Sequence, residues 1–381
     1  MRTKLIFAAA AIGAALLPIA AGTAANAKTV APRGSGEPIA SLNAISADGT
    51  IAVGADSINT FLNPLCGTDL GEHRTSSGWA AQRTPSPACG WLASVVALPH
   101  HKAWAVGYEV TSTAAVRTLT EFYNGSRWQI EPSPNPGVSN YLRGVAVTKS
   151  GTVWAVGSNA QGPIILKRSG GRWVQVKVPI QIDLSSVTVT PAGQVWAVGV
   201  KADPVTFGID TAILHLTSSG WKEVPSPSPG GGNSSYLTSV ASGPHGALWA
   251  VGYYRDPSNF KPHTLTLRYS SGHWSQVASP SPGKSADWLY SAAVSSSGQV
   301  WAVGGYIGPS CEHNLVEHFS SGSWHQVPVP NRGTCSNDST NALYGVTVSG
   351  GNVYAVGQGG IDSLAEVGGS GGHWKILRSA N

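Results

Sequence analysis

Seven copies of a short apolar motif constrain the fold of this chain more than any other feature of its sequence. The copies are IAVG (51–54), AWAVG (103–107), VWAVG (153–157 and 195–199), LWAVG (248–252), VWAVG (300–304) and VYAVG (353–357). Their final glycines follow one another at intervals of 53, 50, 42, 53, 52 and 53 residues. A period near 50 residues indicates a repeat architecture.

Two further motifs recur at fixed places around the first. A leucine-led stretch precedes it: LASVVA (92–97), LRGVAV (142–147), LSSVTV (184–189), LTSVAS (237–242), LYSAAV (289–294) and LYGVTV (343–348). A glycine-containing turn that leads to a tryptophan follows it: Trp79, Trp128, Trp173, Trp221, Trp274, Trp324 and Trp374. An alternating stretch such as TLTLRY (264–269) lies between them. Each repeat therefore predicts four short strands, which we term strands a to d, and no segment has a clear helical period.

Strand b, which holds the repeated motif, is apolar on both faces. In VWAVG the Val, Ala and Gly residues point one way and the Trp and Val residues point the other. An antiparallel sheet with one wet face would alternate apolar and polar residues instead. A strand with two dry faces must lie between two other layers. Four-stranded sheets packed face to face in a ring provide this environment, so we predict an all-β, seven-bladed β-propeller of four-stranded antiparallel blades.

The propeller is expected to span residues 36–381. Strand a of the first blade begins near Ile39, and strand d of the seventh blade lies at Trp374–Leu377. This arrangement gives seven whole blades with no exchange of strands between the termini. The first blade is the least regular, so a contribution of residues 28–38 to ring closure stays open.

At these residues the chain resembles kelch-type propellers, the group that includes the central domain of galactose oxidase. The resemblance lies in the V-aromatic-x-V-G strand, the sheet strand that follows it and the Gly-x-Trp start of the last strand. It implies a fold and no particular activity. The kelch double glycine occurs only at Gly304-Gly305, and the SSGHW turn (270–274) is similar to the Asp-box turns of sialidase-type propellers without their aspartate.

The first 27 residues have the pattern of a secretory signal peptide. Arg2 and Lys4 form a positive region, Leu5 to Ala21 is a run of apolar and small residues, and Ala25-Asn26-Ala27 is a small-x-small cleavage signal. The alternative is an uncleaved membrane anchor, which the cleavage signal disfavours. We expect residues 1–27 to be removed, residues 28–35 to form a short linker, and the mature chain to be secreted and extracellular, with no membrane anchor.

Composition excludes one class of partner. Charged residues make up only 11% of the chain, the formal net charge is +5, and the Lys and Arg residues are scattered rather than clustered. A nucleic-acid partner is therefore not expected. We also expect no cofactor and no bound metal, and we expect a monomer.

Four cysteines permit three disulfide pairings, and the repeat selects one of them. Cys66 and Cys311 fall in loops between strands b and c, whereas Cys89 and Cys335 fall in loops between strands d and a. These two kinds of loop lie at the same end of an antiparallel blade. We predict the disulfides Cys66–Cys89 and Cys311–Cys335, which secretion favours.

Aromatic residues stand at the end of the blade where these loops meet; we call this end the loop face. Twelve of the 14 tryptophans are repeat positions with a structural role. The remaining two stand directly before strand a, where two other blades hold tyrosines, and further tyrosines follow strand b. Aromatic faces suit sugar rings and apolar groups. The candidate ligand-binding residues are Trp91, Trp288, Tyr141, Tyr236, Tyr108, Tyr253, Tyr254 and Tyr306. The alternative is that they cap the blades and cover the core.

Long loops favour the same face. The proline-rich stretches PSPNPGVSN (132–140) and PSPSPGGGNSS (225–235) join strands d and a, and YYRDPSNFKPH (253–263) follows a strand b. Loops on a rigid scaffold commonly carry function. The PSP runs also suit a simpler role as rigid spacers, because proline fixes φ.

Signals of catalysis are weak, and we identify no catalytic residue. The chain holds no GxSxG, HExxH or P-loop motif. Neither a sialidase arginine triad nor a galactose-oxidase copper site is traceable. Three histidines on separate blades, at 73, 263 and 313, are a poor basis for a metal site. Acidic residues on the loop face are Asp56, Glu109, Asp210, Asp256, Asp287 and Asp362, and two of them at a suitable separation would permit glycoside hydrolysis.

The leading functional hypothesis is a secreted propeller that binds an extracellular ligand, a glycan or a protein, at the loop face of the central channel. The first alternative is an extracellular carbohydrate-active enzyme, a hydrolase or lyase, on the same scaffold. The second is a non-catalytic scaffold for protein interactions. The sequence favours a binding protein over an enzyme.

Overall fold

The structure is a computed structural model of the chain. It describes residues 39–58, 67–76, 78–82, 84–85, 89–331, 341–359, 362–369 and 374–378. The expected signal peptide and linker, residues 1–27 and 28–35, lie outside this part. Among the described residues, no helix has the length and apolar character needed to cross a membrane.

The described strands form seven four-stranded antiparallel sheets, each built from four strands consecutive in the chain. The innermost strands are β1 (Ile39–Ile45), β5 (Gly90–Leu98), β9 (Tyr141–Val147), β13 (Asp183–Val189), β17 (Ser235–Ser242), β21 (Ala286–Val294) and β25 (Asn341–Ser349). The second strands are β2 (Ile51–Ile58), β6 (Lys102–Val110), β10 (Val153–Asn159), β14 (Val195–Ala202), β18 (Leu248–Arg255), β22 (Val300–Ile307) and β26 (Asn352–Gly359).

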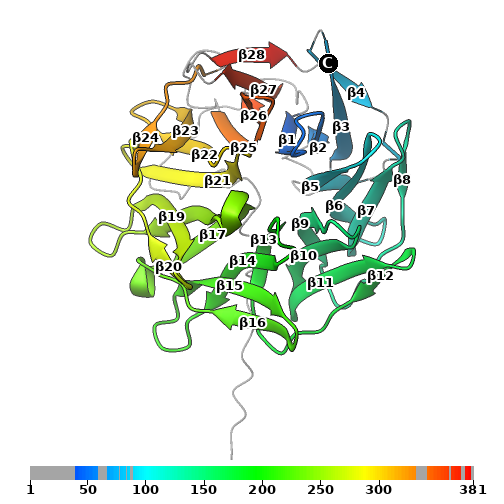
Figure 1. Cartoon of the computed structure of the whole chain (residues 1–381), viewed down its shortest axis with the longest axis horizontal. Coiled ribbons are helices and arrows are strands. Elements are labelled where there is room, and N and C mark those ends of the chain that lie inside the picture. The colour runs from blue at the N-terminus through cyan, green and yellow to red at the C-terminus, as the bar shows by residue number, and fades with distance from the viewer. Residues whose placement is uncertain are drawn as a thin grey trace, which may run out of the picture.

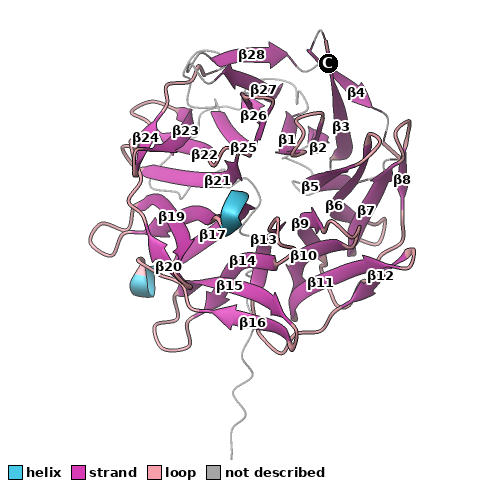
Figure 2. Cartoon of the chain, viewed as in Figure 1, coloured by secondary structure: helices cyan, strands magenta, loops and turns pink. Residues whose placement is uncertain are grey.

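The outer half of each sheet completes the pattern of strands c and d. The third strands are β3 (Thr68–Thr75), β7 (Val116–Tyr123), β11 (Gly162–Ser169), β15 (Ile209–Thr217), β19 (Pro262–Ser270), β23 (Glu312–Ser320) and β27 (Asp362–Gly369). The outermost strands are β4 (Gly78–Gln82), β8 (Trp128–Ile130), β12 (Arg172–Gln175), β16 (Gly220–Val224), β20 (His273–Gln276), β24 (Ser323–Gln326) and β28 (Trp374–Arg378). The helices in the described part are two short 3-10 turns, η2 (Gly231–Asn233) and η3 (Pro244–Gly246) (Figure 2).

The sheets are arranged in a ring around a central channel (Figure 1). Each innermost strand contacts the innermost strands of the sheets before and after it, and β25 contacts β1. The strands of the outer edge, from β4 to β28, lie at the periphery. The prediction of an all-β propeller with four-stranded antiparallel blades is confirmed, and below we number the blades 1 to 7 along the chain.

Packing closes the ring between the two ends of the chain. Strands β1 to β4 form one sheet and β25 to β28 form another, so no strand is exchanged between them among the described residues. Arg74 on β3 donates a 2.6 Å hydrogen bond to the hydroxyl of Tyr354 on β26. The Arg74 guanidinium also lies 4.5 Å from the centre of the Tyr354 ring. A hydrogen bond from Thr347 to the carbonyl oxygen of Ala47 adds to this contact.

The two tryptophan motifs meet across the blade boundaries. The tryptophan of strand b in one blade packs against the tryptophan that starts strand d of the next blade. The pairs are nearly perpendicular, at 75–88°, and their centroids lie 5.3–6.0 Å apart: Trp104–Trp173, Trp154–Trp221, Trp196–Trp274 and Trp249–Trp324. Such edge-to-face pairs contribute about 0.5–1.5 kcal/mol each beyond the burial of their area. The repeat therefore encodes the contact that joins the blades.

The final glycine of each strand b is explained by a β-bulge in the neighbouring strand a. The register between strands a and b shifts directly after the leucine of each strand a. A Cβ on Gly199 would lie 1.9 Å from the carbonyl oxygen of Asp183, and the other six blades have an equivalent clash. The bulged strand approaches strand b too closely for any side chain. The glycine is thus required by the close approach of strands a and b within its own blade, and not only by packing against the next blade.

The proline-rich d–a loops are fixed to strand c. The hydroxyl of Thr211 on β15 bonds to the hydroxyl of Ser226 at 2.7 Å and donates to the carbonyl oxygen of Pro227 at 2.9 Å. The backbone N–H of Thr211 donates to Ser228 at 2.9 Å. The PSP runs that contact Thr118 and Thr264 repeat this arrangement. In blades 2, 4 and 5 these runs are therefore bound to the third strand of the blade.

Two of the four cysteines lie in the described residues. Cys89 and Cys311 are both disulfide-bonded, and no described cysteine is free. Cys66 and Cys335 lie outside the described residues. The pairing Cys66–Cys89 and Cys311–Cys335 therefore stays a prediction.

Candidate site at the mouth of the central channel

The β-bulges turn one side chain of every blade toward the central channel. Bulges often re-aim a side chain beside a functional site, because the extra residue is not held by the pairing ladder. Here the extra residue directly follows the leucine of strand a. The seven residues at this position, which we call the bulge ring, are Asn43, Ala93, Arg143, Ser185, Thr238, Tyr290 and Tyr344.

A cavity of about 500 Å³ occupies the channel, and all seven innermost strands line it. Every member of the bulge ring belongs to its wall. Most of the wall consists of small residues such as Ala, Ser, Val and Thr. Arg143, Tyr290 and Tyr344 are the large side chains with polar groups in this wall, so they give the cavity its chemical character.

Hydrogen bonds between blades hold several members of the bulge ring in place. Asn43 donates to the carbonyl oxygen of Leu92 at 2.9 Å, and Thr238 donates to that of Leu289 at 2.8 Å. Arg143 donates to the corresponding carbonyl oxygen in blade 4, that of Leu184, at 3.4 Å. In each case the acceptor is the leucine before the bulge of the next blade. The ring is therefore preorganised around the channel.

Arg143 brings a positive charge to one side of the channel. Its guanidinium donates to the hydroxyl of Ser158 and lies 5.6 Å from the centre of the Tyr141 ring. Burial lowers the pKa of Arg143, whereas the nearby Asp183 carboxylate raises it. Burial also raises the pKa of Asp183, which Arg143 and Ser158 counteract. An arginine starts from a pKa so high that it stays charged, and this side of the channel can bind an anionic or carbonyl oxygen.

The opposite side of the channel holds two tyrosines, and Glu312, at the start of β23, interacts electrostatically with both of them. The rings of Tyr290 and Tyr344 are 5.3 Å apart. Burial raises the pKa of both hydroxyls well above its usual value, and the charge of Glu312 raises it further. Burial also raises the pKa of Glu312 to about 7. A carboxyl group of this kind exchanges a proton near neutral pH, which suits general acid–base chemistry.

Three of the candidate aromatic residues lie in blades 2 and 3. Trp91 is 7% exposed and stacks on Tyr108, with ring centres 6.2 Å apart. Tyr108 in turn meets the edge of Tyr141 at 4.9 Å. This chain of rings ends next to Arg143, through the contact of Arg143 with Tyr141. These rings support the arginine side chain on the side away from the channel.

The other candidates lie in blades 5 and 6. Tyr236 stacks on Tyr253 at 4.6 Å, and Trp288, which is 6% exposed, packs in the same cluster. Tyr254 lies 5.8 Å from the ring of His263, and Tyr306 stacks on His313 at 4.9 Å. None of the eight candidates belongs to the wall of the channel cavity. They form two packed clusters and two separate pairs, and their role in ligand binding stays a prediction.

Of the predicted acidic and histidine residues, His263 lies 3.9 Å from the carboxylate of Asp256 and interacts electrostatically with Asp287. Asp287 is buried and accepts a 2.6 Å hydrogen bond from the Gly283 N–H, and burial raises its pKa to about 6. Asp256 caps its own loop through Ser258. The side chain of Asp362 lies outside the described residues. In the part of the chain that the structure describes, no three His, Cys, Asp or Glu residues could hold a metal ion.

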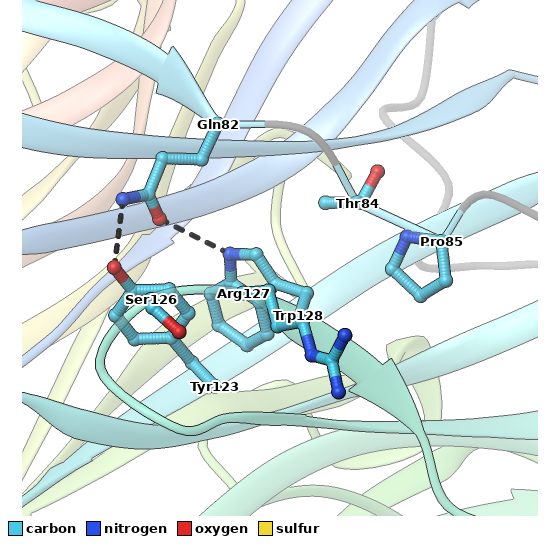
Figure 3. Close-up of a pocket in the computed structure, with 7 residues that line it drawn as sticks. All are labelled: Gln82, Thr84, Pro85, Tyr123, Ser126, Arg127 and Trp128. Atoms are coloured by element: carbon cyan, nitrogen blue, oxygen red, sulfur yellow. Dashed lines mark hydrogen bonds between the residues drawn. The ribbon is translucent and has the colours of Figure 1, made fainter.

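A second cavity, of about 440 Å³, lies between blades 1 and 2 (Figure 3). Trp128 donates its indole N–H to Gln82 at 3.2 Å, and Gln82 donates to the Tyr123 hydroxyl at 3.0 Å. Blade 1 has Ile51 where the other strands b have Trp or Tyr, so Trp128 faces a smaller neighbour here. The polar groups of this cavity form hydrogen bonds with one another, and these bonds link the two blades.

The sequence motifs do not point to the members of the bulge ring or to Glu312. They draw attention to the aromatic residue before the leucine of strand a and not to the residue after it. A signal was available, because Arg143, Tyr290 and Tyr344 are large at a position where the other blades have Asn, Ala, Ser or Thr. The bulge that turns this position into the channel breaks the period-2 alternation. That these residues face the channel therefore does not follow from their spacing in the sequence.

Comparisons with known proteins identify the fold. No protein-family model matches the chain, and no curated protein matches it. A streptogramin B lyase structure is similar with a TM-score of 0.58 and 13% identity, over 86% of this chain and 93% of the other. Virginiamycin B lyase from Staphylococcus aureus gives a TM-score of 0.53 and 13% identity, over 76% and 84% of the two chains.

A third structure is similar over most of both chains. The β-propeller domain of the Trilobed protease from Pyrococcus furiosus, described as having an open velcro topology, gives a TM-score of 0.56 and 8% identity, over 90% of this chain and 97% of the other. At these identities the likeness concerns the fold alone, and this chain is a β-propeller.

Proposed function

We propose that this protein is a secreted, kelch-like, seven-bladed propeller that binds an extracellular ligand, a glycan or a protein, at the mouth of its central channel. The observation that supports this proposal best is the position of Arg143. A cation held at a bulge, in the wall of a cavity of about 500 Å³, faces two tyrosines in the same wall. Clefts with a few convergent polar groups are the usual sites of ligands.

The chemistry of the wall favours a ligand group rich in oxygen. Arginine recognises carboxylates and other anions, and tyrosine adds a ring face and a hydroxyl. A carboxylate on an acidic sugar, or at the end of a peptide, would fit both sides of the channel. The aromatic clusters behind Arg143 and Tyr290 then act as supports that fix the wall.

The first experiment is a glycan-array screen of the chain from Lys28 to Asn381, followed by titration calorimetry with each hit. We expect Arg143→Gln and Tyr344→Phe to weaken binding, Arg143→Gln by at least about tenfold because a hydrogen bond to a charged group contributes about 1.5–3 kcal/mol. Arg172→Gln, a change on the exposed edge strand β12, is the matched control. Equal affinity of Arg143→Gln and the parent protein for every hit would exclude the channel as the site.

A second function, carbohydrate hydrolysis or elimination, is favoured by one observation. Glu312, with a pKa of about 7, interacts with both tyrosines of the channel wall. In a hydrolase or lyase it would act as a general acid or base. Product analysis of each glycan hit tests this function. Turnover that Glu312→Gln abolishes while binding persists would place catalysis in the channel.

A further inference from the structure

Two neighbouring blades carry the same loop between strands b and c. The loop DPVTFG (203–208) connects β14 to β15 in blade 4, and DPSNFK (256–261) connects β18 to β19 in blade 5. Both contain the motif Asp-Pro-x-x-Phe. We call these two loops the aromatic fingers.

The two fingers have the same internal hydrogen bonds. In the first, the Asp203 N–H donates to the Gly208 carbonyl oxygen at 2.9 Å and the Phe207 N–H donates to the Asp203 carbonyl oxygen at 3.0 Å. In the second, Asp256 N–H donates to Lys261 at 2.9 Å and Phe260 N–H donates to Asp256 at 2.8 Å. In both, the aspartate carboxylate accepts the N–H two residues later, at 2.8 and 2.7 Å. Each finger is therefore a defined structure and not a loose connection.

Each finger holds its phenylalanine in the left-handed region of backbone conformation. The φ angles are 58° for Phe207 and 60° for Phe260. This conformation favours glycine and is strained for a bulky residue. Several a–b turns of this chain place glycine at left-handed positions, for example Gly151, Gly193 and Gly298, whereas the turns of blades 2 and 5 hold histidines there. A bulky residue at such a position calls for a functional reason.

Folding does not provide that reason, because both phenylalanines face solvent. Phe207 is 85% exposed and Phe260 is 62% exposed, and Val205 in the first finger is 82% exposed. In the described residues, the other two phenylalanines, Phe122 and Phe319, pack on the tryptophans of strand b. The finger phenylalanines therefore adopt a strained backbone conformation and add nothing to the hydrophobic core.

The fingers belong to one continuous surface on the loop face. Thr206 of the first finger lies against Gly232 in the next d–a loop. Ser234 in the same loop accepts a 2.9 Å hydrogen bond from the N–H of Arg255, at the base of the second finger. The d–a loop thus bridges the two fingers. They stand at the same end of the blades as the bulge ring.

Basic residues border the second finger. Arg255, Lys261 and Lys284 are exposed, and the Lys261 ammonium donates to the Lys284 carbonyl oxygen at 3.1 Å. The carboxylates of Asp203 and Asp256 accept hydrogen bonds within their own fingers. At the base of the first finger, Lys201 pairs with Glu223 and lies beside Asp210 in the strand register. Each finger therefore exposes a phenylalanine, and exposed basic residues border the second finger.

We propose that the aromatic fingers attach this propeller peripherally to a lipid surface that contains anionic headgroups. Two projecting tips do not form the flat or concave apolar surface that a standard protein interface needs. A lipid interface deforms around such tips, accepts phenylalanine at the boundary of headgroups and acyl chains, and attracts a lysine and arginine rim. The proposal is independent of the channel site.

The test is co-sedimentation of the chain from Lys28 to Asn381 with vesicles of phosphatidylcholine containing about 30 mol% phosphatidylglycerol. The parent protein should sediment with these vesicles and more weakly with pure phosphatidylcholine. The double variant Phe207→Asn/Phe260→Asn should lower the partition coefficient at least about tenfold. Asparagine tolerates the left-handed conformation, so the fingers keep their shape. Phe207→Trp/Phe260→Trp should retain binding.

The matched control is Val174→Asn, which removes an exposed apolar side chain from the edge strand β12. It should leave vesicle binding unchanged, and circular dichroism and thermal melting should verify that all variants fold. Hydrogen exchange on vesicles should protect residues 203–208 and 256–261. Failure of the parent protein to bind either vesicle, equal binding by the double Asn variant, or protection confined to the a–b turns would each overturn the proposal.

Discussion

At the scale of single residues, the repeated glycine of strand b is the most constrained position in the chain. The bulge in strand a brings a carbonyl oxygen to 1.8–2.0 Å from the place where a Cβ would stand. The same bulge aims Arg143, Tyr290 and Tyr344 into the channel. The β-bulge therefore explains both the glycine of the repeat and the composition of the candidate site.

The substitution Gly199→Ala tests this explanation. The new Cβ would meet the Asp183 carbonyl oxygen at 1.9 Å, so strands a and b of blade 4 must separate. We expect a loss of about 3 kcal/mol or more in the free energy of unfolding, measured by urea denaturation. The control is Gly232→Ala, where the nearest atom lies at 3.4 Å. Similar stability of the two variants would contradict the role of the bulge.

At the scale of elements, the middle of strand c differs between two groups of neighbouring blades. The residue paired with the alanine of strand b is Leu166, Leu214 or Leu267 in blades 3 to 5, but Glu72, Glu121, Glu317 or Glu366 in blades 1, 2, 6 and 7. The first three of these glutamates are buried. Burial raises their pKa, to about 7 for Glu72 and about 10 for Glu121, where a hydrogen bond to Asp69 adds to the effect.

Buried glutamates make stability depend on pH. A carboxyl whose folded pKa lies above the usual 4.5 binds its proton more tightly in the folded chain. Its contribution is complete below pH 4.5 and is lost as the pH rises toward the folded pKa. We expect the melting temperature to fall between pH 5 and pH 8, with about 1.4 kcal/mol lost per pH unit for each carboxyl that stays protonated.

The variant Glu317→Leu should reduce this slope. Both carboxyl oxygens of Glu317 are buried without a hydrogen-bond partner among the described residues, and leucine occupies the same place in blades 3 to 5. The gain in melting temperature over the parent protein should be larger at pH 8 than at pH 5. An equal gain at both values would show that folding does not raise the pKa of Glu317.

At the scale of the whole molecule, stability depends on closing the ring between the first and last blades. Most blade boundaries are joined by a pair of tryptophans, but this one relies on Arg74 and Tyr354. Blades 1 and 7 also share no strand in the described residues. The boundary between them is the place where the ring should open first.

Arg74→Ala should weaken that boundary selectively. It removes a charged hydrogen bond and a cation–π contact, and we expect a loss of about 1–3 kcal/mol. Hydrogen exchange should become faster in β1 and in β25 to β27 than elsewhere. Arg268→Ala, which removes a longer contact of 5.6 Å over Trp249, is the control. A uniform rise of exchange in all blades would argue against local opening.

The disulfides should add to the same stability. Peptide mapping without reduction should recover the pairs Cys66–Cys89 and Cys311–Cys335. Each closes a short loop at the loop face, and its removal should cost about 3 kcal/mol. The variants Cys89→Ser and Cys311→Ser would each lower the melting temperature. Recovery of any other pair would contradict the assignment of these loops to one end of the blades.

The sequence by itself determined the architecture, because the information lies in local patterns. The period near 50, the glycine turns and the doubly apolar strand b each specify strands and their order. The same patterns identified the tryptophans as structural, and these pack between the blades. Local pattern is sufficient here because each blade repeats the same contacts with its neighbours.

Tertiary structure alone decided which side chains face the channel. A bulge shifts strand a by one residue, so alternation counted along the sequence assigns Arg143, Tyr290 and Tyr344 to the wrong side. It also decided that Trp91 and Trp288 pack into clusters, and that two phenylalanines stand in strained, exposed fingers. Such features depend on the backbone geometry of bulges and loops and on the packing of side chains far apart in the sequence, which the spacing of the motifs does not specify.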